Sequence, residues 1–278
     1  MDIDWRPKTW VAILLGVFLQ AFTFLYLNRP KLFWVYFLLS VLVSILDWRY
    51  QTSYVAIFSL ICPIHAYLVV RHFNLSRERA WYSKWWGIPT IYGVFFTSVF
   101  LVRAFLYEPF VVPSVSMAPT INAGDFVLVK KFGYGTYGTY GIKLSNDDVS
   151  SADLMQRGKL YAFYLPGKDV IYVKRLIALP GDTLAITGNQ VILNGSVLTT
   201  EKLSQQEGHT VYQQVLDGVT YTIRHLRMRA SGDMQKVVVP AKSYFFMGDN
   251  RDNSVDSRHL GYITSDNIVG EVSYIFKP

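Results

Sequence analysis

The sequence is poor in cysteine and in charged residues. Cys62 is the single cysteine among 278 residues, so the sequence allows no intrachain disulfide and no cysteine-based metal site. Only 17% of the residues are charged and 51% are hydrophobic, which is too apolar for an ordinary soluble protein. The net charge is +7, but no aromatic-interleaved basic stripe or recognition motif accompanies it. We therefore predict no nucleic-acid partner.

Two common hydrolase signatures are also absent. The sequence has no H-E-x-x-H motif for zinc and no G-x-S-x-G nucleophile elbow. Three of its five histidines, His209, His225 and His259, lie in the second half, and none belongs to a recognisable triad segment. We predict no metal and no cofactor, so any hydrolytic chemistry needs another nucleophile and another base.

Long apolar runs are concentrated before Pro113. Four segments stand out, namely Thr9–Leu27, Leu32–Leu46, Tyr54–Val70 and Trp85–Val102. A spanning helix needs roughly 20 residues, with about 17 as the lower limit, so the first and fourth qualify easily and the other two run short. No small-residue cleavage site follows the first segment, which argues against a signal peptide. We predict a membrane region over residues 1–107 with about four transmembrane helices.

The charges of the loops predict an orientation. The linker Arg71–Lys84 carries four basic residues and one acid, which favours the cytoplasmic side. With four crossings, the N-terminus and everything after Val102 lie outside; alternatively, the first two segments form a hairpin that does not cross. His65 lies within the third segment. An ionisable residue there is a functional candidate, although a neutral histidine packed against neighbouring helices is the simpler interpretation.

After residue 108 the pattern changes to short alternating runs separated by Gly, Pro, Asn and Asp. They predict strands at Phe126–Val129, Leu160–Leu165, Val170–Ala178, Gln190–Leu193, Val237–Val239, Tyr244–Met247 and Val272–Phe276. Asn194-Gly195 is typical of a two-residue hairpin turn. We predict a mostly β domain over residues 108–278, with a polar insertion near residues 201–232. The Gly/Tyr repeat at residues 132–141 indicates either a flexible loop or an aromatic tip at the lipid headgroups.

Ser116 is the first candidate for chemistry. It lies in a loop bracketed by Pro113 and Pro119, and prolines restrict a loop in a way that suits a pre-aimed nucleophile. The Ser114 hydroxyl and the Ser116 backbone N–H together could form an oxyanion hole, in which each donor contributes about 3–4 kcal/mol. Taken alone, a Ser-x-Ser loop is more often a simple turn.

Lys174 is the second candidate. It lies between the apolar runs Val170–Val173 and Leu176–Leu179, where burial would lower the lysine pKa from about 10.4 towards neutrality and yield a neutral base. Alternation along a strand then sends Arg175 to the solvated face. A solvent-facing strand lysine is the plainer alternative.

A polar cluster follows at Gly248–Arg258. Its repeated Asp and Asn resemble a calcium loop, but the twelfth position counted from Asp249 is Leu260, which cannot supply the required carboxylate. A polar network is the better interpretation. In it Asp256 pairs with Arg258, and Ser254 orients a neutral amine.

In its ordered motifs the chain closely resembles bacterial type I signal peptidases. The matching segments are Arg103–Phe110, Pro113–Thr120, Gly124–Lys130, Tyr172–Asp182 and Gly248–Arg258. The resemblance implies a β-sheet catalytic domain on N-terminal transmembrane helices, with Ser116 as nucleophile and Lys174 as general base. It implies supporting roles for Ser114, Ser254, Asp256 and Arg258, and a substrate-binding surface formed by Phe110, Val112, Pro113, Ile121, Tyr172 and Val173.

The same resemblance implies partners and a location. The substrates would be signal peptides of exported preproteins, cleaved after small residues at −3 and −1, and the other partners the lipid bilayer and the secretion translocon. The enzyme would be a multi-pass protein of the bacterial inner membrane with its catalytic domain outside. Two alternatives stay open: a polytopic membrane protein whose outer β-domain only binds exported chains, and a self-cleaving Ser–Lys protease of the repressor type.

Overall fold

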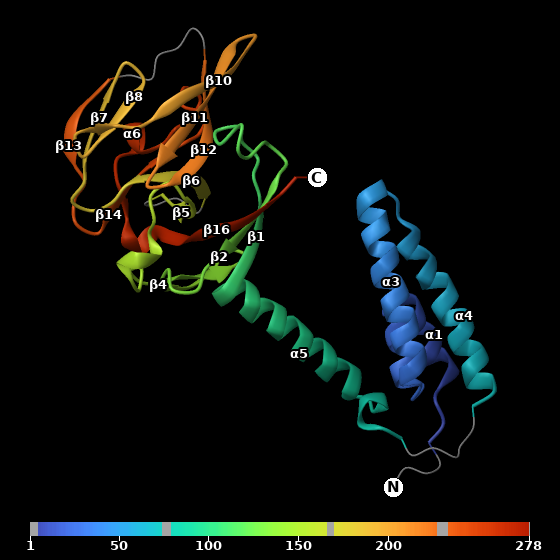
Figure 1. Cartoon of the computed structure of the whole chain (residues 1–278). Helices are drawn as coiled ribbons and strands as arrows, with labels where there is room; N and C mark the ends of the chain where they lie inside the picture. The colour runs from blue at the N-terminus through green and yellow to red at the C-terminus, as the bar shows by residue number, and fades with distance from the viewer. Residues whose placement is uncertain (1–4, 74–78, 166–169, 227–232, 278) are drawn as a thin grey trace. The chain divides into compact units, whose positions relative to one another are not determined.

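The computed structural model describes residues 5–73, 79–165, 170–226 and 233–277. The chain divides into two compact units, Met1–Ser98 and Val99–Pro278. The first unit is helical and the second is mostly β (Figure 1). This confirms the predicted fold class of a β-rich domain preceded by apolar helices.

Three helices among the described residues are long and apolar enough to cross a membrane. They are α3 (Pro30–Tyr50), the stretch Tyr54–Arg71 formed by η2 (Tyr54–Ile57) and α4 (Phe58–Arg71), and the stretch Gly87–Leu106 formed by α5 (Gly87–Leu101) and the π-helical η4 (Val102–Leu106). The expectation that the second segment runs short was wrong, because its helix is 21 residues long.

The expectation of a continuous first span was also wrong. The segment forms three pieces, α1 (Thr9–Phe18), η1 (Gln20–Phe22) and α2 (Thr23–Tyr26). Gln20 takes a left-handed conformation with φ of 44°, which interrupts the helical hydrogen-bond ladder. The ten residues of α1 extend about 15 Å, only half of the hydrocarbon thickness of about 30 Å.

Beyond Gln20 the chain folds back along α1. The Thr23 hydroxyl donates to the Ala12 carbonyl at 2.8 Å, and the Lys8 backbone N–H donates to the Tyr26 hydroxyl at 2.9 Å. α1 packs closely on α4: a Cβ on Gly16 would lie 2.7 Å from the backbone of Pro63. The first apolar segment is therefore a short helical hairpin.

Aromatic contacts gather several chain segments at one end of this unit. The Trp5 ring meets Tyr26 and Phe73 edge-on at 5.6 and 5.9 Å, and the Arg79 guanidinium lies 4.1 Å from the Trp5 ring centroid. These residues come from the N-terminal segment, the end of the hairpin, the second residue after α4 and the approach to α5. Trp5, Phe73 and Arg79 thus share one end of the unit.

The second unit is built on a seven-stranded antiparallel sheet with the order β1-β2-β16-β5-β6-β14-β15. Its strands are β1 (Tyr107–Val111), β2 (Phe126–Lys130), β5 (Leu160–Tyr164), β6 (Ile171–Ala178), β14 (Ser243–Met247), β15 (Ile263–Thr264) and β16 (Ile268–Phe276). Strand β6 is covered on both faces, because Leu176 and Ile177 belong to different hydrophobic clusters.

Three smaller sheets complete the unit. They contain β3 (Thr136–Thr139) with β4 (Ile142–Asn146), then β7 (Thr183–Thr187), β8 (Gln190–Leu193), β9 (Ser196–Val197) and β13 (Met234–Val238), and finally β10 (Thr200–Gln206), β11 (His209–Leu216) and β12 (Val219–Leu226). The short helices η5 (Ala152–Leu154), α6 (Ser257–Leu260) and η6 (Ser265–Asn267) lie between strands. The predicted turn at Asn194-Gly195 is confirmed, since both residues have positive φ and Leu193 pairs with Ser196.

Two weakly patterned segments turn out to be regular. The predicted polar insertion contains β10 to β12, although residues 227–232 of it lie outside the described residues. Its strand β10 is exposed along its whole length, whereas Tyr221 and Ile223 of β12 are buried in the core. The Gly/Tyr repeat runs into the β3–β4 hairpin, in which Tyr140 is 70% exposed.

Candidate active site

Ser116 lies in the loop between β1 and β2. The buried side chains of Met117 and Ile121 hold this loop against the sheet, in a cluster with Val127 and Val129. Ser116 itself is partly exposed, and its hydroxyl oxygen lies 3.1 Å from that of Ser114. An anchored loop with an accessible hydroxyl is the arrangement that a nucleophile needs.

Lys174 lies on β6, and its side chain extends to the Ser116 hydroxyl. Its side-chain nitrogen Nζ is hydrogen-bonded to Ser116 Oγ, and the residue is only 3% exposed. Burial lowers the pKa of Lys174 to about 8, although the nearby Asp256 and Asp249 carboxylates oppose that shift. About a tenth of the Lys174 amine is then neutral at pH 7 and about half at pH 8, and the neutral amine is the form that a base requires.

Arg175, expected on the solvated face, is buried instead and is 4% exposed. Its Nε and Nη2 donate to the two carboxylate oxygens of Asp249 at 2.8 and 2.6 Å, and its guanidinium lies 4.0 Å from the Tyr221 ring centroid. The expectation was wrong because β6 is a central strand with both faces covered, so alternation does not bring either side chain to water.

Asp249 and Asn250 hold the β1–β2 loop that carries Ser116, residues 112–125, in place; this loop is called the serine loop. The Asn250 backbone N–H donates to the Ser116 carbonyl at 3.1 Å, and its side-chain amide donates to the Val115 carbonyl at 3.0 Å. The Thr120 hydroxyl donates to Asp249. Sequence reasoning did not assign roles to these residues, although the density of Asp and Asn directly after β14 was a usable signal.

The predicted pair of Asp256 and Arg258 is present. Arg258 donates from Nε and Nη2 to the two oxygens of Asp256, both at 2.8 Å, and the Gly248 N–H donates to Asp256 at 2.8 Å. Burial pushes the pKa of Asp256 upward, but these hydrogen bonds and the Arg258 charge hold it below its usual range. The carboxylate therefore stays charged beside Lys174.

Ser254 is buried and lines the same cavity as Ser116 and Lys174, the pair called the dyad below. The structure contains no hydrogen bond from its hydroxyl to Lys174 among the described residues, so the proposed orienting contact is not formed here. A Cβ on Gly248 would lie 2.2 Å from Ser254 Oγ and 2.6 Å from the Ser116 carbonyl oxygen. Only glycine fits at position 248, a constraint that the sequence alone did not reveal.

A cavity of about 1190 Å³ opens over Ser116 and Lys174. Two chain segments, residues 110–116 and 170–174, line it together with residues 251–255. Five of the six predicted substrate-binding residues contribute to the lining, namely Phe110, Val112, Pro113, Tyr172 and Val173. Ile121 does not, because its side chain is fully buried beneath the loop.

The described residues contain no group of three or more His, Cys, Asp and Glu side chains that could hold a metal ion. The chemistry that the site offers is that of a hydroxyl beside an amine of lowered pKa, under a cavity with an amphipathic lining. Such a pair is suited to acyl transfer.

Comparisons with known proteins show relatives of one family. A family model described as "Signal peptidase, peptidase S26" matches residues 85–277. The chain is 40% identical over 200 residues to a signal peptidase I from Pseudomonas fluorescens, covering 64% of this chain and 68% of the relative. It is 31% identical over 237 residues to a signal peptidase I from Buchnera aphidicola, covering 68% and 74%. A crystal structure of a signal peptidase I from Enterococcus faecalis aligns at 26% identity with a TM-score of 0.29, covering 43% of this chain and 97% of that one.

Proposed function

The chain belongs to the signal peptidase family of S26 peptidases, and from this premise we propose how its residues carry out the reaction. Ser116 is the nucleophile and Lys174 is the general base of a membrane-bound serine endopeptidase. The enzyme removes N-terminal signal peptides from exported preproteins after small residues at −3 and −1. The observation that carries the proposal is the hydrogen bond between Ser116 Oγ and a buried Lys174 Nζ.

In the acylation step Ser116 Oγ attacks the scissile carbonyl carbon while neutral Lys174 accepts the hydroxyl proton. The tetrahedral intermediate collapses as Lys174 gives that proton to the departing amine, which leaves an ester on Ser116. A water then attacks the ester while Lys174 accepts its proton. Lys174 returns that proton to Ser116 Oγ as the C–O bond breaks, so the signal peptide leaves as a carboxylic acid, which ionises in water, and the free serine and neutral lysine are regenerated. Both nucleophilic attacks begin from the neutral amine that burial favours.

The negative charge that develops on the carbonyl oxygen in the tetrahedral intermediate needs hydrogen-bond donors to stabilise it. The Ser114 hydroxyl, 3.1 Å from Ser116 Oγ, and the Ser116 backbone N–H are the proposed pair. Donors of this kind contribute about 3–4 kcal/mol each. Asn250 supports their geometry, because it hydrogen-bonds the carbonyl groups of Val115 and Ser116.

Substrate selection follows from an extended peptide lying in the cavity. In an extended chain alternate side chains point to one face, so residues −1 and −3 both face the same wall. We assign that wall to Phe110, Val112, Tyr172 and Val173, which line the cavity. Side chains that fill the wall leave room only for small substrate residues.

The apolar helices of the first unit anchor the enzyme in the bacterial inner membrane, with the catalytic unit on the outer side. There it meets preproteins as they emerge from the secretion translocon with the signal peptide still in the bilayer. The three helices long enough to span support a multi-pass arrangement.

Incubation of the detergent-solubilised full chain with a preprotein tests the proposal. Wild-type protein and a Ser204→Ala control, altered on the exposed strand β10, should release a mature chain whose N-terminal sequence follows a small-x-small site. Ser116→Ala should release no mature chain, because it lacks the nucleophile. Lys174→Arg should release none either, because arginine stays protonated and cannot accept a proton. Comparable cleavage by either of these two variants would rule out the dyad.

A further inference from the structure

A second cavity lies in the helical unit, between the start of α3 and the end of α4. Its volume is about 510 Å³, and its lining is Arg29, Pro30, Lys31, Leu32, His65, Leu68, Val69 and His72. We propose that this cavity binds the headgroup of an anionic phospholipid. The site is separate from the peptidase chemistry and does not depend on it.

The cavity is formed by two antiparallel helices. The lining residues of α4 and its cap, His65, Leu68, Val69 and His72, are spaced at i, i+3, i+4 and i+7 and so share one helix face. The lining residues of α3 come from its first turn, which begins at Pro30. The positive end of the α3 dipole therefore adds to the potential of the cavity.

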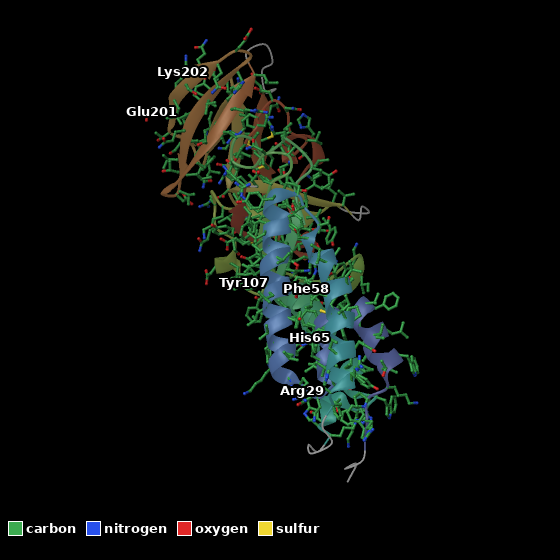
Figure 2. All side chains as sticks on the ribbon, turned by 90° about the vertical axis from the view of Figure 1, so that its right-hand side faces the viewer. Arg29, Phe58, His65, Tyr107, Glu201 and Lys202 are labelled. Atoms are coloured by element: carbon green, nitrogen blue, oxygen red, sulfur yellow. The ribbon has the colours of Figure 1, made fainter. Side chains whose placement is uncertain are left out.

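His65 closes the inner end. Its Nδ1 is hydrogen-bonded to the Tyr36 hydroxyl at 2.7 Å, and its ring packs edge-on against Phe24 at 5.3 Å. Tyr36 and Phe24 stack on each other at 4.7 Å behind it. These contacts occupy Nδ1 and fix the ring, so His65 presents its other nitrogen, Nε2, as the remaining polar group. Figure 2 labels His65 and Arg29 on the helices of this unit.

His72 lies at the outer end, where its Nδ1 is hydrogen-bonded to the Leu68 carbonyl at 3.0 Å. Because a carbonyl only accepts, this nitrogen is the donor and the ring is oriented along the helix end. The cavity thus runs from an inner imidazole to an outer imidazole, with Arg29 and Lys31 contributed by the facing helix.

The chemistry of the lining selects the ligand. Four of the eight lining residues are basic, and the lining contains no acid among the described residues. The other four are apolar, which suits the glycerol backbone and the first carbons of acyl chains rather than a free ion. Arginine and lysine bind phosphate oxygens strongly, and basic pockets between transmembrane helices bind acidic headgroups on the cytoplasmic side.

The location agrees with the chemistry. Arg29, Lys31, Arg71 and Arg79 lie at the end of the unit that carries most positive charge, which the positive-inside rule assigns to the cytoplasm. The cytoplasmic leaflet is the one rich in anionic lipid. A phosphatidylglycerol molecule therefore reaches this cavity from the surrounding bilayer without crossing the membrane.

Native mass spectrometry of the full chain in detergent tests the proposal, with dioleoyl phosphatidylglycerol and dioleoyl phosphatidylcholine as probes. The wild type should bind one phosphatidylglycerol in clear preference to phosphatidylcholine. The double variant Arg29→Gln/Lys31→Gln should weaken phosphatidylglycerol binding roughly 30-fold, the effect of two such charges near an anionic surface. The control Arg49→Gln/Lys202→Gln removes the same net charge from exposed positions elsewhere and should stay within about twofold of the wild type.

A third variant separates the cavity from general charge attraction. Leu68→Trp leaves every charge in place but fills the lining at a half-exposed position, and it should also abolish the preference for phosphatidylglycerol. Equal losses in the cavity and control double variants, or undiminished binding by Leu68→Trp, would overturn the site. Competition by inorganic phosphate at a similar concentration would show a free-anion site and would overturn the lipid assignment.

Discussion

Lys174 and Arg175 are neighbours on β6 and both are buried, yet their surroundings give them opposite protonation behaviour. The two carboxylate oxygens of Asp249 pair with Arg175, and although burial opposes it, they hold the pKa of Arg175 above its usual value. Lys174 has no hydrogen bond to an acid among the described residues, so burial dominates and its pKa falls to about 8. The strand therefore carries a permanent cation and a titratable base side by side.

Gly248 is the residue where backbone space matters most. Alanine there would force its Cβ within 2.6 Å of the Ser116 carbonyl oxygen and closer still to Ser254. The serine loop must move, and a displacement near 1 Å costs about 100-fold in rate. We expect Gly248→Ala to lower kcat/KM for preprotein cleavage by roughly that factor.

The matched control for that substitution is Gly93→Ala, because a Cβ at Gly93 meets nothing within 4 Å. It should cleave at nearly the wild-type rate. Equal rates for Gly248→Ala and Gly93→Ala in the same assay would show that the close approach at Gly248 does not position the nucleophile.

At the scale of elements, Asp249 links the end of β14 to both β6 and the serine loop. Replacement with Asn leaves Arg175 as a buried cation without its partner, which costs about 3–5 kcal/mol of unfolding free energy. It also weakens the hydrogen bond that Thr120 donates to Asp249. We expect Asp249→Asn to lower both the unfolding temperature in detergent and kcat.

Asp217 provides the comparison for Asp249→Asn. It also pairs with an arginine, Arg157, at 2.7 Å, but its side chain is 53% exposed. Exposed pairs contribute at most about 1 kcal/mol, so Asp217→Asn should shift the unfolding temperature little. A similar shift in both variants would contradict the structural importance of the buried pair.

The strands that the sequence predicts are those with a strong apolar signal. β2, β5, β6, β8 and β14 combine β-branched or aromatic residues with turn residues at their ends, so local pattern suffices. β10 was not predicted because its side chains are largely polar and exposed throughout, so that pairing with β11, rather than local propensity, determines it. β11 and β12 are half apolar, and the alternation of Val219, Tyr221 and Ile223 in β12 was a usable signal.

Hydropathy could not predict the break in the first apolar segment. It reports composition alone, and residues 9–27 have the composition of a spanning helix although they form three short pieces. The backbone conformation at Gln20, with φ of 44°, depends on packing between α1, α2 and α4. Likewise the pairing of Ser116 with Lys174 was predictable from motifs, whereas the clamp by Asn250 and the close contact at Gly248 require the folded geometry.

At the scale of the whole molecule, charge and helix number together define an orientation. The segments that meet at one end of the helical unit carry the basic residues Arg6, Lys8, Arg29, Lys31, Arg71 and Arg79. The opposite end of α3 carries Arg49 beside Asp47. If the three long helices cross the membrane and the hairpin does not, the N-terminal segment at Trp5 and the catalytic unit lie on opposite sides. We therefore propose a cytoplasmic N-terminus, in place of the external one that four spans would require.

Cysteine labelling tests this orientation. The buried Cys62 is replaced by alanine, and single cysteines are placed at the exposed positions Arg6, Arg71 and Lys202. In intact cells an impermeant thiol reagent should label the cysteine at position 202 only, and permeabilised cells should show all three. Labelling at position 6 without permeabilisation would restore the external N-terminus.

The dependence of cleavage on pH tests the central claim most directly, because it measures the protonation state of the proposed base. The neutral form of Lys174 is active, so kcat/KM of the full chain on a preprotein must rise as that lysine loses its proton. We predict a rising limb with a midpoint near the lowered pKa of about 8, and no turnover at any pH for Lys174→Arg. A midpoint near 10.5, the value of an unperturbed lysine, would contradict the account.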